Sequence, residues 1–79
     1  MPKQTRDQIK RHAAYIRGCI ERCEEHMQIL HQRFEPVHPE HAAVLVTCVE
    51  GLDVVDELFT RWCECVLGEV PEMLDRWRE

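Results

Sequence analysis

The sequence predicts an all-α protein in which two long antiparallel helices form a helical hairpin and a short third helix follows. Two stretches of about thirty residues carry apolar side chains at alternating steps of three and four, which is the spacing of a heptad seam. Pro36 and Pro39 separate the stretches. A membrane span needs an apolar run of about 18 residues, and no such run is present. We therefore expect one soluble, cytoplasmic domain over residues 1–79.

The first helix is predicted over Thr5–Phe34. Thr5 and Gln8 have the spacing of a capping box, in which each side chain binds a free backbone N–H group of the first turn. Pro36 and Pro39 end the helix because neither can continue one. The predicted seam consists of Ile9, Ala13, Ile16, Ile20, Cys23, Met27, Leu30 and Phe34.

The second helix is predicted from about Pro39 to Leu67, with Pro39 suited to its first position and Gly68 to its C-terminal cap. Its predicted seam consists of Leu45, Cys48, Leu52, Val55, Phe59, Trp62 and Val66, and a further apolar lane consists of Val44, Gly51, Leu58 and Cys65. One partner helix cannot cover both. Beyond Pro71, a short helix from Glu72 to about Arg78 would place Val70, Leu74 and Trp77 over the open end of the hairpin.

A hairpin of this size buries little apolar surface by itself, and small domains usually need a disulfide, a metal or a second copy. The extra lane favours a second copy, so the sequence predicts a homodimeric four-helix bundle. The predicted dimer interface contains Val44, Leu58, Trp62 and Cys65. The alternative is a monomeric hairpin clasped by its own C-terminal helix.

Charge is divided unevenly along the chain. Residues 1–34 carry seven Lys and Arg against four Asp and Glu (+3), whereas residues 35–79 carry three against eleven (−8). The two halves should attract each other, although exposed ion pairs are weak. The acidic half could also dock on a basic surface of a protein partner. The candidate partner-binding residues are Glu50, Asp53, Asp56, Glu57 and Glu64, within an acidic set that continues through Glu69, Glu72 and Asp75.

Metal or thiol chemistry is the alternative from another class. Cys19 and Cys23 lie four apart, and Cys48, Cys63 and Cys65 lie on the second helix. Thiolates on facing helices could bind zinc or Cu(I), but we expect reduced thiols that pack as small hydrophobes, with Cys23 and Cys48 on the seams. His38 and His41 have a spacing that could supply two zinc ligands, with no Cys or acidic pair obviously beside them. Together with His12, His26 and His31 they are expected to be surface or turn residues, so no metal site and no cofactor are predicted.

Nucleic-acid binding is a weaker alternative. A basic stripe at the start of the first helix could contact phosphates; it consists of Lys3, Arg6, Lys10, Arg11, Arg17 and Arg22. Acidic residues interrupt the stripe, and the isoelectric point is about 5.5. For catalysis, the sequence shows no nucleophile with a nearby base, no Gly-rich phosphate loop and no paired carboxylates in a pocket, so we expect no enzyme.

The segment from Pro39 to Thr47 resembles the start of the second helix in small phage-encoded anti-CRISPR proteins of the type I-E class. The shared pattern is a helix-initiating proline followed by an Ala-Val-aliphatic-Val-Thr run, and it covers about nine residues. No functional residue carries over from the resemblance. It implies a stoichiometric inhibitor that binds a host nuclease-recruiting complex. With the residue patterns, it leads us to expect a non-enzymatic interaction protein, either an inhibitor or an adaptor.

Overall fold

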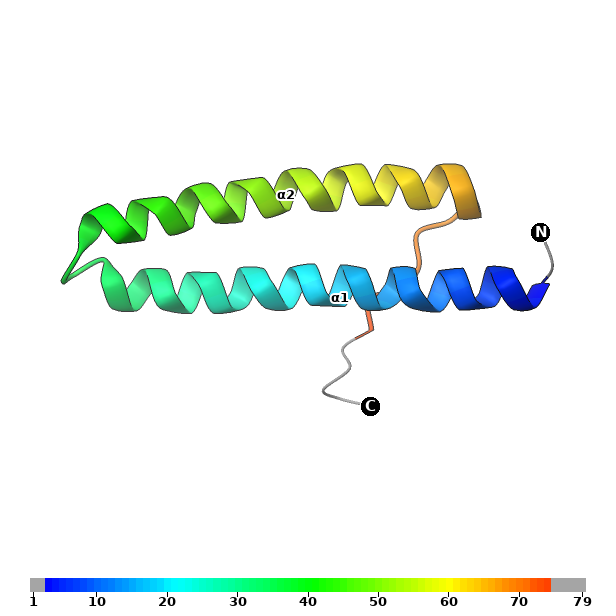
Figure 1. Cartoon of the computed structure of the whole chain (residues 1–79), viewed down its shortest axis with the longest axis horizontal. Helices are drawn as coiled ribbons and strands as arrows, with labels where there is room; N and C mark the ends of the chain where they lie inside the picture. The colour runs from blue at the N-terminus through cyan, green and yellow to red at the C-terminus, as the bar shows by residue number, and fades with distance from the viewer. Residues whose placement is uncertain (1–2, 75–79) are drawn as a thin grey trace.

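Two helices run antiparallel along the whole length of the molecule and pack against each other (Figure 1). The computed structural model describes residues 3–74. Helix α1 spans Lys3–Phe34 and helix α2 spans Pro39–Leu67, and the principal extents are 53 × 26 × 13 Å. The predicted all-α helical hairpin is confirmed, because no strand occurs within the described range.

The boundaries of α2 agree with the prediction at both ends. Pro39 lies in the first turn, and Gly68 caps the C-terminus in the left-handed conformation with φ 72°. The amide of Gly68 donates to the carbonyl of Glu64 at 3.0 Å. A residue with a Cβ is strained at this φ, so a glycine is favoured there.

The start of α1 differs from the prediction. The helix already includes Lys3, so Thr5 lies inside the first turns and the proposed capping box at Thr5 and Gln8 is wrong. Helix ends are set by a few backbone hydrogen bonds, and the pattern of seam residues gives no information about extra turns outside it.

The turn between the helices satisfies the backbone groups that the helices leave unpaired. The amides of Val37 and His38 both donate to the carbonyl of Phe34, at 3.0 and 2.7 Å, and the amide of Ala42 donates to the carbonyl of His38 at 3.2 Å. Orphan groups of both helices are thereby paired, which makes residues 35–38 a compact connection.

The line along which α1 and α2 face each other, here called the hairpin seam, follows only half of the predicted seam positions. Ile9, Ala13, Ile20 and Met27 of α1 and Leu45, Leu52 and Phe59 of α2 are buried or half-buried, as predicted. The other predicted positions are exposed: Ile16, Cys23, Leu30, Phe34, Cys48, Val55, Trp62 and Val66. Their places in the seam are taken by the next residues along the chain: Arg17, Glu24, His31, Val49, Asp56, Cys63 and Leu67.

The reason for this rotation is the small size of the side chains at the contact. The buried apolar residues that pack together at the contact are Ala13, Cys63 and Leu67, whereas Ala14 is covered by residues 71–74 where the chain crosses α1. Each helix has an apolar arc wider than one seam, and the hairpin closes along the side of the arc where alanine and cysteine allow the helices to approach. The larger side chains are left beside the contact.

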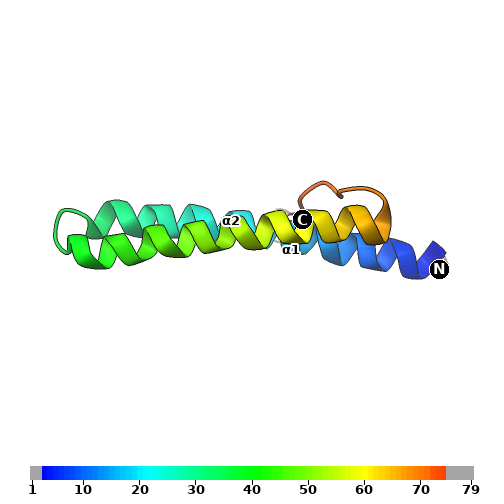
Figure 2. The same ribbon diagram turned by 90° about the horizontal axis from the view of Figure 1, so that it is seen from above.

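Residues 68–74 leave the end of α2 and cross α1 without forming a helix, so the predicted C-terminal helix does not begin at Glu72. The amide of Leu74 donates to the carbonyl of Ala14 at 3.0 Å. Figure 2 shows this segment on one side of the layer formed by the two helices. The rest of the predicted helix, including Trp77, lies outside the described residues.

Candidate interaction surfaces

One broad side of the hairpin carries many large apolar side chains that remain exposed to solvent. We call it the open apolar face. Eight of its residues are large hydrophobic side chains with 41–60% of their surface exposed: Ile16, Leu30, Phe34, Val44, Val55, Leu58, Trp62 and Val66. Cys19, Cys23, Cys48, Gly51 and Cys65 complete the face, and all five are exposed. No member of the set is charged.

Helix geometry places these residues on one side. Ile16, Leu30, Val55, Trp62 and Val66 each come directly before a residue of the hairpin seam. On a right-handed helix, the side chain one residue earlier is rotated by about 100° around the helix axis. Because the two helices run in opposite directions, the residues before the seam residues lie on the same side of the hairpin in both helices.

All four residues predicted for a dimer interface lie on this face. Val44 and Leu58 are 60% and 58% exposed, and Trp62 is 44% exposed. The Trp62 ring stacks on Phe59 with the centroids 5.4 Å apart and 12° between the planes, so its orientation is fixed by a seam residue. Cys65 is exposed as well.

The cysteines are divided between this face and the core. Cys19, Cys23, Cys48 and Cys65 are free and exposed, whereas Cys63 is free and buried. The expectation that Cys23 and Cys48 are packed inside the hairpin is therefore wrong. Burial raises the pKa of the Cys63 thiol, and the charge of Arg17 opposes part of that rise; Cys63 acts as a small core residue.

The acidic residues predicted to bind a partner form a row on the opposite side, here called the acidic row. Glu50, Asp53, Glu57 and Glu64 each come directly after a hairpin-seam residue, and all four are exposed. Glu57 accepts a hydrogen bond from Arg61 at 2.8 Å. A residue that directly follows a seam residue lies about 100° further round α2, on the side away from the open apolar face.

Asp56, predicted as a fifth member of that set, lies in the hairpin seam instead. It is half-buried, and its Oδ1 atom is buried without a hydrogen-bond partner among the described residues. Glu24 of α1 lies nearby. Desolvation, a hydrogen bond shared with Asp53 and the charges of Asp53, Asp56 and Glu21 raise the pKa of the Glu24 carboxyl. The middle of the seam therefore holds carboxylates that repel each other.

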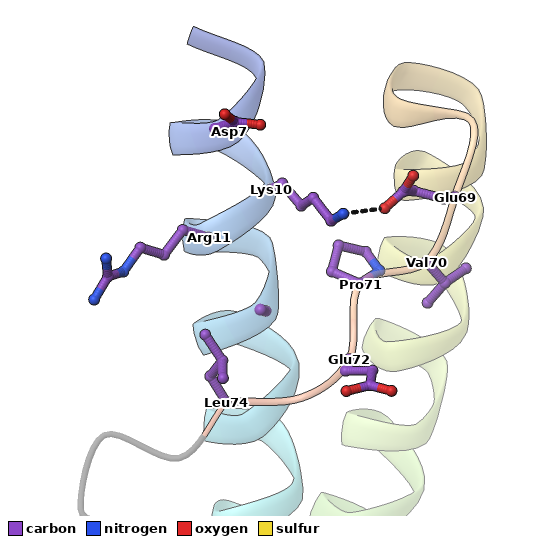
Figure 3. A pocket seen from close by; sticks show the side chains of 9 residues that line it. Asp7, Lys10, Arg11, Glu69, Val70, Pro71, Glu72 and Leu74 are labelled. Atoms are coloured by element: carbon purple, nitrogen blue, oxygen red, sulfur yellow. Dashed lines mark ion pairs between the residues drawn. The ribbon is translucent and has the colours of Figure 1, made fainter. Parts of the chain in front are cut away.

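The basic side chains at the start of α1 hold the C-terminal segment. The guanidinium of Arg6 donates to the carbonyl of Leu67 at 2.6 Å, and that of Arg17 donates to the carbonyl of Pro71. Lys10 forms a 2.5 Å ion pair with Glu69, and the two side chains point toward each other in Figure 3. This is the attraction between the two halves that the charge division predicts.

A groove of about 570 Å³ remains where this segment crosses α1. Its lining includes Asp7, Lys10 and Ala14 from α1 and Glu69, Pro71 and Leu74 from the segment. The groove is wide open to solvent, and its charged groups are those that fix the segment. It is a by-product of docking the segment on the helix.

The hairpin turn brings together three groups that can bind a metal. One ligand atom from each of His38, Glu40 and His41 lies within 4.8 Å of the other two. The sequence analysis found the two histidines but not Glu40. The signal for Glu40 in the sequence was its position between His38 and His41 in the first turn of the second helix, next to the hairpin turn.

Comparison of the chain with family models, with curated proteins and with solved structures gives no match. Within residues 3–74, neither helix is long and apolar enough to cross a membrane.

Proposed function

We propose that this protein is a non-enzymatic protein–protein interaction module. In this proposal two copies join through their open apolar faces to form a four-helix bundle, and the acidic row on the outside binds a basic surface of a larger macromolecular complex. The open apolar face is the observation that carries the proposal. Monomeric proteins rarely expose so many neighbouring large hydrophobic side chains.

The balance between core and surface supports association. Six apolar residues are buried, and three of them are alanines, whereas eight large hydrophobic side chains are exposed on one side. Side-chain burial is the main force that offsets the entropy lost on folding. A hairpin with this distribution has more to gain from covering its open apolar face than from its own core.

A second copy is the occupant that fits best. None of the residues that define the face is charged, and the nearest exposed carboxylate on α2, Glu40, lies at its edge, one turn before Val44. The middle of the face can therefore meet a second copy without like charges opposing each other, despite the net charge of −5 per chain. The two helices have 32 and 29 residues and lie side by side along the 53 Å length of the molecule, which provides room for the roughly 800 Å² that each partner of a stable interface buries. Two hairpins face to face give a four-helix bundle.

Charge substitutions on the two sides of α2 test the dimer. Leu58→Glu and Val44→Glu each place a carboxylate in the open apolar face. By light scattering, the parent should have twice the chain mass of 9.4 kDa, and each variant should have the mass of one chain. Val46→Glu is the matched control, because Val46 is also exposed, at 43%, but lies on the side of the acidic row. A parent protein that stays at the monomer mass at micromolar concentration would refute the dimer.

The acidic row is proposed as the partner-binding surface because it remains exposed when the open apolar face is covered. Rim charges of this kind steer encounter with an oppositely charged partner. The resemblance of residues 39–47 to anti-CRISPR proteins favours an inhibitor over an adaptor. In that case the partner is a host nuclease-recruiting complex, and the protein blocks its activity at a fixed stoichiometry.

Charge reversal tests this second part separately. A Glu50→Lys/Glu57→Lys/Glu64→Lys variant should lose capture of a specific host complex while keeping the dimer mass. A Glu35→Lys/Glu72→Lys variant changes exposed carboxylates outside the row and should keep capture. Equal capture by both variants would remove the acidic row from the proposal.

Nucleic-acid binding is disfavoured because most residues of the basic stripe already bind other groups of the chain. Arg6, Lys10 and Arg17 bind the C-terminal segment, and Arg22 pairs with Glu25 at 3.4 Å. Cations that already have partners gain less from a phosphate, because they must first break the contacts they have. Binding that weakens steeply with salt would restore the nucleic-acid alternative.

A further inference from the structure

We propose that the hairpin turn binds one Zn²⁺ or a similar divalent transition-metal ion, held by His38, Glu40 and His41. The ligand atoms of all three lie within 4.8 Å of one another. The Nδ1 atom of His38 is 3.4 Å from Oε1 of Glu40, and the rings of His38 and His41 lie 5.5 Å apart between centroids. None of the three residues belongs to either interaction surface of the proposed function, and the site lies at the end of the open apolar face, one turn before Val44.

The distances suit a tetrahedral ion. Bonds of about 2.0–2.2 Å from zinc to nitrogen and oxygen place neighbouring ligand atoms roughly 3.3–3.6 Å apart. The pair formed by His38 and Glu40 already has that separation. His41 closes the remaining gap by turning an exposed side chain, which needs no repacking of the core.

The backbone keeps the three residues together. His38 immediately precedes α2, and its carbonyl accepts hydrogen bonds from the amides of His41 and Ala42 at 3.0 and 3.2 Å. Pro39, between the ligands, has a fixed φ. The backbone thus keeps the three residues close together before an ion binds, so that only side-chain rotations remain to be ordered.

The donor set indicates the kind of ion. Two neutral imidazoles and one carboxylate match the preference of zinc and similar divalent transition metals, whereas calcium and magnesium prefer oxygen ligands only. All three residues are exposed, so an ion can enter from solvent and water can complete its coordination. The carboxylate offsets part of the unfavourable interaction between a cation and a helix N-terminus.

Zinc titration of the whole chain at pH 7.5, followed by NMR of the five imidazole rings, tests the site. We expect saturable binding of one ion per chain, with the resonances of His38 and His41 shifting together and those of His12 and His26 unchanged. His38→Ala/His41→Ala should weaken the Kd for Zn²⁺ at least about tenfold, and Glu40→Gln should weaken it as well. His12→Ala/His26→Ala is the matched control and should leave the Kd unchanged.

Three outcomes would overturn the proposal. An unchanged Kd in His38→Ala/His41→Ala would mean that the exposed thiols hold the ion. An unchanged Kd in Glu40→Gln would remove the third ligand. The absence of saturable binding up to millimolar Zn²⁺ would remove the site. The substituted side chains are exposed, so circular dichroism should show the parent helix content in each variant.

Discussion

Glu24 is a half-buried acid in the hairpin seam that faces other acids instead of a base. Its pKa is raised, first by desolvation and then by Asp53 and Asp56. The folded state therefore binds the proton more tightly than the unfolded state, for which the ordinary value of 4.5 applies. It follows that the contribution of Glu24 to stability falls as the pH rises through the window above 4.5.

Glu24→Gln should accordingly raise the free energy of unfolding at pH 7, because the amide carries no charge to desolvate or repel. The gain should shrink as the pH is lowered toward 4.5, because the raised pKa makes the folded parent bind more of its proton there than the unfolded chain does. Urea unfolding at both pH values measures the difference. Glu25→Gln, on the exposed side of the same turn, is the control and should change stability by less than about 0.5 kcal/mol.

Glu69 titrates in the opposite direction, in a different window. A hydrogen bond and the charge of Lys10 lower its pKa, with smaller contributions from Arg6. The stability contributed by this ion pair is present above pH 4.5 and is lost as the pH falls further. The two effects have opposite signs on acidification, so a gain between pH 7 and 4.5 does not come from Glu69.

For individual residues, the sequence predicted which side chains form the apolar side of each helix. It predicted correctly only about half of the side chains that face the other helix. Ile20 and Leu52 lie in the hairpin seam as expected, whereas Ile16 and Val55, with the same spacing, are exposed. A period of 3.5 residues locates an apolar arc, and where on that arc the partner packs depends on side-chain size at the contact. Arg17, Glu24 and Asp56 could not be placed in a seam from an apolar pattern.

At the scale of elements, the segment 68–74 depends on a single glycine of α1. A Cβ added at Gly18 would lie 2.0 Å from the carbonyl oxygen of Leu74, and the amide of Leu74 binds the carbonyl of Ala14. The segment can lie this close to the helix only because Gly18 has no side chain.

Gly18→Ala should therefore release the segment from α1, even though alanine favours the helix by about 1 kcal/mol. Because these effects oppose each other in global stability, the measurement is hydrogen exchange at the Leu74 amide, which should lose its protection. Gly51→Ala is the matched control, since a Cβ there meets nothing within 4 Å. Retained protection in Gly18→Ala would show that the segment can shift without detaching.

Sequence patterns located the elements unevenly. Pro39 and Gly68 mark the two ends of α2, because each acts through its own backbone. The sequence predicts a helix from Glu72 that would place Val70, Leu74 and Trp77 on one side, but residues 68–74 form no helix where they cross α1. Contacts between residues sixty positions apart, such as Arg6 with Leu67, leave no local pattern that could have predicted this.

For the whole molecule, the proposed dimer would link folding to association, because the core of one hairpin is small. If two copies bury their open apolar faces together, the folded dimer is favoured by mass action at higher protein concentration. Raising the concentration a hundredfold should raise the Tm by roughly 5–10 °C. Thermal melts followed by circular dichroism measure this, and the Leu58→Glu variant should lose the dependence. A parent Tm independent of concentration would contradict coupled folding and dimerisation.

The stacking of Trp62 on Phe59 gives the open apolar face its own optical reporter. An indole ring that is 44% exposed emits at longer wavelength than one shielded from water, and the ring is held in place by its stacked neighbour. In a Trp77→Phe background, fluorescence comes from Trp62 alone, because the chain has two tryptophans. A blue shift on concentration, or on adding any partner that covers this side, then reports occupancy without a label.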